Sequence, residues 1–172
     1  FNDALFQRIR HVHETAAAAD LTPEQARLTR RSYERSVRNG AALDAAGKAE
    51  LGRINQALSN AFTAFQQKVV ADEQLITHYV TEADLDGLPD SNKSAAAAAA
   101  RSRELDGWVI VNTRSAVDPF LTFADNRAKR EEIWRKFVNR GDNGDSNDTN
   151  DTIAQILDLR AQRARLLGFE TY

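Results

Sequence analysis

The stretch of sequence that decides the fold runs from Asp106 to Phe169. It begins with a short apolar segment, Trp-Val-Ile-Val (108–111), and continues through Ser-Ala-Val-Asp-Pro-Phe-Leu-Thr-Phe (115–123) into a charged segment (125–140). A loop of mostly Gly, Asn and Asp (141–150) leads to the last segment, Ile-Ala-Gln-Ile-Leu-Asp-Leu-Arg-Ala-Gln-Arg-Ala-Arg-Leu-Leu-Gly-Phe (153–169). This order of apolar run, helical spacing and turn residues predicts one strand followed by three helices.

Each of these three helices has a start signal in the sequence. Ser115 is predicted to cap the first helix, Asp125 or Asn126 the second and Asp151 the third, because their side-chain oxygens can accept hydrogen bonds from free N–H groups. The loop at 141–150 is predicted to be mobile. Helical spacing predicts two buried stripes, one of Ile133, Trp134, Phe137 and Val138 and one of Ile153, Ile156, Leu157, Ala161, Ala164 and Leu167.

Three more helices are predicted upstream. Residues 3–18, capped by Asp3, carry an apolar face made of Leu5, Ile9, Val12 and Ala16. The start signal at 22–25 (Thr-Pro-Glu-Gln) and the stop signal Asn39-Gly40 predict a helix over 23–38. Residues 44–72 predict a helix roughly 40 Å long. Its stripe consists of Leu51, Ile54, Leu58, Phe62, Phe65 and Val69.

Two short strands are predicted, one at 75–80 and one at 108–112. Between them lie a helical turn after Thr81 and a helix that opens at Ser91 and contains six consecutive alanines (95–100). This connection fits a small crossover unit, right-handed if the strands are parallel, but the sequence leaves their direction open. The predicted fold is mainly α, a layered helical bundle with one long helix and a small two-stranded β element.

Composition limits the size and class of the molecule. The 172 residues, of which 42% are hydrophobic, allow one sizeable core, so we expect residues 1–172 to form a single helical domain. The net charge of −2 indicates no general attraction to nucleic acid or to anionic membranes. The absence of cysteine excludes disulfides and thiolate zinc sites and suits the cytoplasm, with the periplasm as the alternative. Because the sequence holds no methionine and opens inside a helix start, we interpret it as an excised fragment.

Two groups of residues resemble metal sites without meeting their requirements. His11 and His13 lie about 200° apart on a helix, whereas zinc needs two histidines four residues apart and a third ligand. The loop at 141–150 is rich in side-chain oxygens but lacks the glycine and glutamate positions of an EF-hand. We therefore interpret the first group as a surface histidine pair and the second as a solvated loop.

The remaining signals do not indicate a catalytic site. One helix face carries Arg27, Arg31, Arg35 and Arg38. Because Glu24 and Glu34 lie nearby, we interpret this face as a salt-bridged, solvated surface and not as a phosphate-binding one. Arg-Gly-Asp (140–142) is interpreted as a helix end followed by a turn. No nucleophile motif, phosphate-binding glycine loop or dinucleotide fingerprint occurs. We assign no catalytic, cofactor-binding or metal-binding residue to this chain.

Several segments together resemble the thimet oligopeptidase family of zinc metallopeptidases. They are the strand at 108–111, Pro-Phe-Leu-Thr-Phe (119–123), Asn126-Arg-x-x-Arg-Glu-Glu-Ile-Trp-Arg, Arg-Gly-Asp-Asn-Gly (140–144) and the segment at 153–168. Two features, the Arg-Gly-Asp-Asn-Gly turn and the ending at 159–169, are most similar to the peptidyl-dipeptidase (Dcp) branch of this family. Residues 43–55, 71–73 and 81–89 agree with the same family, so the resemblance covers nearly the whole chain.

The resemblance implies a non-catalytic portion of the N-terminal half of a large, helical, two-lobed enzyme. In that family, zinc is bound by a His-Glu-x-x-His helix in the second half of the polypeptide, and no residue here matches it. The resemblance implies a role in walling a channel that admits short peptides, with the rest of the enzyme as partner and possible self-association of the isolated chain. We expect no peptidase activity from the chain alone. The alternative is a stand-alone helical interaction module without enzymatic activity.

Overall fold

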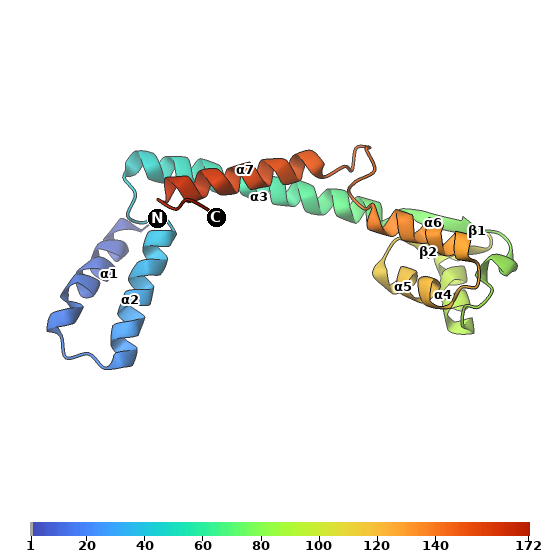
Figure 1. The fold of residues 1–172 in the computed structure, drawn as a ribbon, viewed down its shortest axis with the longest axis horizontal. Helices are drawn as coiled ribbons and strands as arrows, with labels where there is room; N and C mark the ends of the chain where they lie inside the picture. The colour runs from blue at the N-terminus through green and yellow to red at the C-terminus, as the bar shows by residue number, and fades with distance from the viewer. Residues whose placement is uncertain (1) are drawn as a thin grey trace. The chain divides into compact units, whose positions relative to one another are not determined.

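The computed structural model describes residues 2–172, and most of them are helical (Figure 1). They divide into two compact units: unit 1 comprises Phe1–Ala61 and Gln155–Tyr172, and unit 2 comprises Phe62–Ala154. Two helices, α3 (Ala45–Glu73) and α7 (Asn150–Leu166), contribute residues to both units. The predicted mainly α fold with one long helix and a small two-stranded element is confirmed.

Unit 1 contains a helical hairpin formed by α1 (Asp3–Thr15), a 3₁₀ turn (Ala16–Ala18) and α2 (Pro23–Arg38). The bounds of α2 are those predicted, and Thr22 and Gln25 form a reciprocal capping box. The predicted cap of α1 is wrong by one residue, because the side chain of Asn2 accepts the hydrogen bond from Leu5 N–H (3.0 Å). Asp3 instead forms an ion pair with Lys48 (2.6 Å).

The hairpin buries little of its own apolar surface. Tyr33 stacks with His13 and Phe6, with ring centroids 4.2 and 6.0 Å apart, and Phe6 is the one buried residue of the two helices. On the apolar face predicted for α1, Leu5 and Val12 are both more than half exposed. The sequence signals thus match the bounds of α2, but the hydrophobic contact between α1 and α2 is weak.

The core of unit 1 uses the first part of α3 and most of α7. Leu51, Ile54 and Leu58 are buried as predicted, and Arg53 reaches Gln162 on α7 (3.4 Å). Farther along the same stripe, in unit 2, Phe62 is exposed. On α7 the buried apolar residues are Ile156, Leu159 and Ala164, whereas the predicted Ile153 and Leu157 are exposed. The helix also starts two residues earlier than a cap at Asp151 predicts, so Asp151 lies in its first turn and does not cap it.

Unit 2 contains the two strands, β1 (Ile76–Tyr79) and β2 (Trp108–Val111), which pair antiparallel with Thr77 opposite Ile110. The connection between them is therefore not a parallel crossover. Within it, a 3₁₀ turn (Glu82–Leu85) precedes α4 (Asp90–Arg101), which begins one residue before the predicted Ser91. The helix α4 packs against β2, and two of its alanines, Ala96 and Ala100, are buried.

Helices α5 (Arg114–Phe123) and α6 (Arg127–Val138) complete unit 2. Asn126 caps α6, as one of the two predicted alternatives, but Ser115 lies inside α5 and does not cap it. On α6 the predicted stripe is only partly buried, because Trp134 and Val138 are each about half exposed. The core is a cluster of Tyr79, Leu85, Leu88, Ala96, Ile110, Val117, Phe120, Ala124 and Ile133.

Candidate functional site

The most extensive polar site in the described residues lies in unit 2, where the end of α3 meets the loop at 141–150. At its centre Asp72 is fully buried, with 0% of its surface exposed. One carboxylate oxygen of Asp72 accepts hydrogen bonds from Gly141 N–H (2.7 Å) and from the amide of Asn143 (2.9 Å). The other oxygen accepts from the amide of Asn147 (2.9 Å). All three donors are neutral N–H groups of the loop, so a buried carboxylate binds one loop at its first, third and seventh residues.

The loop also closes on itself beside Asp72. Gly141 C=O accepts hydrogen bonds from both the N–H (2.7 Å) and the hydroxyl (2.9 Å) of Thr149. Gly141 has a positive φ of 75°, and a Cβ at this position would lie only 2.9 Å from the Thr149 side chain. Glycine is therefore required here both by backbone conformation and by space. Lys68 holds the far end of the loop by donating to Asp148 C=O (2.6 Å).

The aspartates of the loop are occupied by loop donors. Asp148 accepts from Asn150 N–H (2.9 Å) and Gly144 N–H (3.1 Å), and these hydrogen bonds lower the pKa of its carboxyl group. Asp142 accepts from the amide of Asn150 (2.7 Å). The segment that composition predicts to be mobile is thus hydrogen-bonded along its length. The oxygen-rich sequence forms an internal network in place of a calcium-binding loop.

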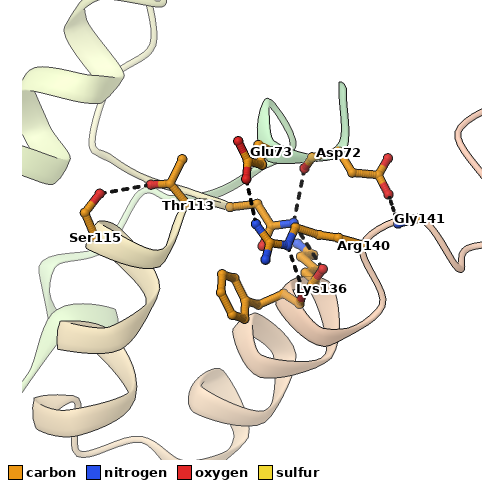
Figure 2. A network of polar contacts seen from close by, with 9 residues as sticks. Asp72, Glu73, Thr113, Ser115, Lys136, Arg140 and Gly141 are labelled. Carbon is orange, nitrogen blue, oxygen red and sulfur yellow. Dashed lines mark hydrogen bonds and ion pairs between the residues drawn. The ribbon is translucent and has the colours of Figure 1, made fainter. Parts of the chain in front are cut away.

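Glu73, next to Asp72 on the chain, takes a different partner (Figure 2). It forms an ion pair with Arg140 (2.9 Å), whose guanidinium lies over the ring of Phe137 at 4.1 Å. The Arg-Gly-Asp tripeptide is therefore a helix end followed by a turn, as predicted, with Arg140 bound to Glu73 and Gly141 buried. The two adjacent carboxylates, Asp72 and Glu73, fix the chain on either side of the junction between α6 and the loop.

A second buried side chain, Asn112, links this site to the sheet. Its amide donates to Asp72 C=O (3.1 Å) and to Lys136 C=O (3.0 Å), so it joins the ends of α3 and α6 to the residue that follows β2. The Lys136 ammonium in turn donates to Thr77 on β1 (3.0 Å). These hydrogen bonds hold the main chain in position, so the role of the polar side chains here is structural.

The residues that the sequence singled out lie elsewhere. His11 is exposed and His13 stacks on Tyr33, both on α1 in unit 1. The four arginines of the stripe on α2, Arg27, Arg31, Arg35 and Arg38, are not buried, and the ion pair on that helix joins a fifth arginine, Arg30, to Glu34 (3.9 Å). Across residues 2–172 no three His, Asp or Glu side chains are grouped as metal ligands, and no helix is long and apolar enough to span a membrane.

Sequence reasoning missed Asp72 as the centre of this site. A lone aspartate near the end of a predicted amphipathic helix gives no signal of burial. The Gly141 and Asn positions of the loop were visible in the sequence, but they indicate a turn and do not identify a partner 69 residues away. The sequence signal that could have indicated a buried acceptor was the number of amide donors at 141–150. A buried carboxylate provides the acceptor that these donors need.

Comparison with known proteins identifies relatives of this chain. No family model matches it. The sequence is 30% identical to oligopeptidase A of Escherichia coli (strain K12) over 176 residues, covering 99% of this chain and 26% of that protein. It is 32% identical to the dipeptidyl carboxypeptidase of the same organism over 173 residues, covering 99% of this chain and 25% of that protein. Over nearly its whole length the chain is thus similar to members of the thimet oligopeptidase family.

The family extends to eukaryotic organelles and is matched over only one part of each relative. The organellar oligopeptidase A of Arabidopsis thaliana is 29% identical over 98% of this chain, which covers 22% of that protein. The chain thus spans about a quarter of the length of the curated relatives it matches. The resemblance read from the sequence motifs is confirmed at the level of the family.

Proposed function

We propose that this chain is a non-catalytic segment of a zinc-dependent oligopeptidase or peptidyl-dipeptidase, helping to wall the channel that admits short peptides. The observation that carries the proposal is the extent of the match, which takes in 98–99% of this chain but only 22–26% of each relative. The relatives are named for cleaving oligopeptides and for removing dipeptides from a carboxyl terminus. By analogy, the enzyme that includes this segment removes C-terminal dipeptides from short peptides, and we place it in the cytoplasm.

The residues of this chain do not fit a zinc site. Its three histidines are His11 and His13 on α1 and His78 on β1, and the sequence contains no His-Glu-x-x-His segment. In the proposal, zinc and the groups that activate water belong to another part of the enzyme. The role of the segment is to hold its helices and the loop at 141–150 in fixed positions, which the buried Asp72 network supports.

The exposed apolar residues of unit 1 support a partner within the same enzyme. Leu28 is 68% exposed, and Leu5 and Val12 lie with it around an open groove between α1 and α2. Isolated apolar side chains are common on protein surfaces, but a contiguous group indicates a surface that another element covers. We propose that the remainder of the peptidase covers this groove, and that the isolated chain uses it to self-associate.

A segment exchange tests the proposal. The quarter of E. coli oligopeptidase A that matches this chain is replaced by residues 1–172, and hydrolysis of an internally quenched peptide is measured. We expect activity within about tenfold of the unmodified enzyme, a change of about 1.4 kcal/mol in activation free energy. The control lacks the segment and should be inactive. A chimera that folds and binds zinc but does not cleave the peptide would contradict the proposal.

The non-catalytic character is tested on the chain by itself. Purified residues 1–172 are incubated with the same quenched peptide, with and without added zinc. We expect the rate of peptide hydrolysis to be no higher than in buffer alone. Cleavage that a chelator abolishes would show that the chain carries its own catalytic site and would favour a complete small enzyme over a segment.

A further inference from the structure

The outer edge of β1 is a strand edge whose main-chain groups have no partner among the described residues. The sheet has the order β1-β2, so each strand has one neighbour. The N–H of Asn112 donates to Leu75 C=O (3.0 Å), and the register places Thr77 and Tyr79 in the following hydrogen-bonded pairs. Because these pairs alternate along an antiparallel ladder, the N–H and C=O groups of Ile76 and His78 point away from β2.

The two edges of this sheet differ in what covers them. The helix α4 packs along β2, and Val109 is buried there. On β1, in contrast, His78 is exposed and Val80, immediately after the strand, is 73% exposed. The imidazole of His78 donates from Nε2 to the C=O of Asp106 (2.5 Å), two residues before the start of β2, so the ring is held toward β2. The outer main-chain groups of β1 are therefore open to a partner.

The side chains of β1 favour pairing with an extended chain. The sequence from Leu75 to Val80 is Leu-Ile-Thr-His-Tyr-Val, rich in residues that favour strands and free of proline, lysine, arginine, aspartate and glutamate. Natural edge strands are usually protected by lysine, proline, a bulge or a covering element, none of which is present at these six positions. Ile76, His78 and Val80 share one face, on which Ile76 and Val80 offer apolar contacts to alternate residues of a partner.

We propose that the outer edge of β1 binds an extended peptide, which adds a third strand to the sheet. Main-chain hydrogen bonds to Ile76, His78 and Val80 would supply binding without sequence specificity, as in other strand-addition complexes. The choice of a peptide as occupant rests on the proposed function in a peptidase. The open edge itself follows from the hydrogen-bond ladder between β1 and β2 and from the exposure of β1.

The probe is the blocked peptide Lys-Thr-Val-Thr-Val-Thr-Lys, titrated into ¹⁵N-labelled residues 1–172 and followed by NMR. We expect the amide signals of Ile76, His78 and Val80 to shift and their exchange with solvent to slow about tenfold at saturation. The amides of Thr77 and Tyr79, which already face β2, should exchange as before. The same peptide with N-methylated central amides should not bind, because it cannot donate to the edge.

Two variants of one residue separate the main chain from the side chain. His78→Pro removes the outward N–H while leaving the ladder to β2 intact, a substitution that edge strands tolerate. His78→Ala removes the imidazole but keeps the N–H. We expect His78→Pro to weaken binding of the probe about tenfold or more and His78→Ala to change it less than about threefold. Circular dichroism should show both variants folded.

Several outcomes would overturn the inference. They are shifts confined to residues away from β1, equal binding of the N-methylated peptide, or equal effects of the two His78 variants. Signals at β1 that depend on protein concentration and not on the probe would assign the edge to a second copy of the chain. The segment exchange reports on the proposed function separately, so an active chimera with no peptide binding at β1 would reject this inference alone.

Discussion

The helical hairpin of unit 1 and the Asp72 site of unit 2 are stabilised in different ways. The hairpin has strong local signals, including a reciprocal capping box at Thr22 and Gln25, yet Phe6 is its one buried residue. The Asp72 site has weak local signals, yet it joins α3, α6, β2 and the loop through buried hydrogen bonds. Local sequence patterns thus determine where a helix begins and ends, while tertiary stability depends on contacts that those patterns do not show.

The largest expected effect is the loss of the central carboxylate. Asp72→Ala leaves Gly141 N–H and two loop amides without their acceptor and should lower the free energy of unfolding by about 4 kcal/mol. Asp72→Asn keeps one oxygen acceptor and should cost about half as much. Urea unfolding followed by circular dichroism measures both. An effect of Asp72→Ala below about 1 kcal/mol would show that the site is not a stabilising centre.

The second-largest effect is expected for a residue in the core of unit 2, with a residue of the hairpin as its comparison. Ile133 on α6 is buried in the core of unit 2, whereas Leu28 on α2 is 68% exposed. Ile133→Ala should cost about 3 kcal/mol, because it removes buried methyl groups and leaves a cavity. Leu28→Ala should change the free energy of unfolding by less than about 0.5 kcal/mol. Similar costs for the two variants would remove the distinction between the two regions.

The capping box gives a smaller effect confined to unit 1. The Thr22 hydroxyl accepts from Gln25 N–H (3.3 Å), and the Gln25 side chain accepts from Thr22 N–H (3.0 Å). Thr22→Ala should lower the helicity of α2 and cost about 1 kcal/mol. Thr22→Ser keeps the acceptor and serves as the control. Thr22→Ala should leave the structure of the loop at 141–150 unchanged, since that loop belongs to unit 2.

The smallest effect at neutral pH concerns Tyr79, whose hydroxyl is buried and has no hydrogen-bond partner in the described chain. Tyr79→Phe should change stability by less than about 1 kcal/mol at pH 7, because no hydrogen bond is lost. Burial, then the nearby Glu132 and Asp84 carboxylates, raises the pKa of Tyr79 in the folded protein. Above about pH 10 the unfolded state loses this proton first, so stability falls by up to about 1.4 kcal/mol per pH unit. Tyr79→Phe should lack this component of the alkaline loss in thermal melts.

The sequence predicts secondary structure more completely than burial. Capping residues, spacing and β-branched runs predict the bounds of α2, and they predict the bounds of α3 and of both strands to within one residue. The helix stripes are less well predicted, because Trp134 and Leu157 have helical spacing but face solvent. Spacing shows which residues share a face and does not show whether another element covers it.

The candidate site was the part least accessible to prediction. Asp72 and Gly141 are 69 positions apart, and a single sequence holds no record of such a contact. The direction of the two strands was likewise undetermined, because a long helical connection permits either. The family resemblance, in contrast, rests on ordered local motifs and was visible from the sequence alone.

Amide hydrogen exchange across residues 2–172 tests the central comparison most directly. We predict that Gly141 and Thr149 N–H exchange only with opening of the core of unit 2, within about 1 kcal/mol of Ile110, because both are held in the Asp72 site. Amides in the middle of α1 and α2 should exchange at least tenfold faster, at about 1.4 kcal/mol lower free energy. Fast exchange at Gly141 together with slow exchange throughout the hairpin would contradict the account.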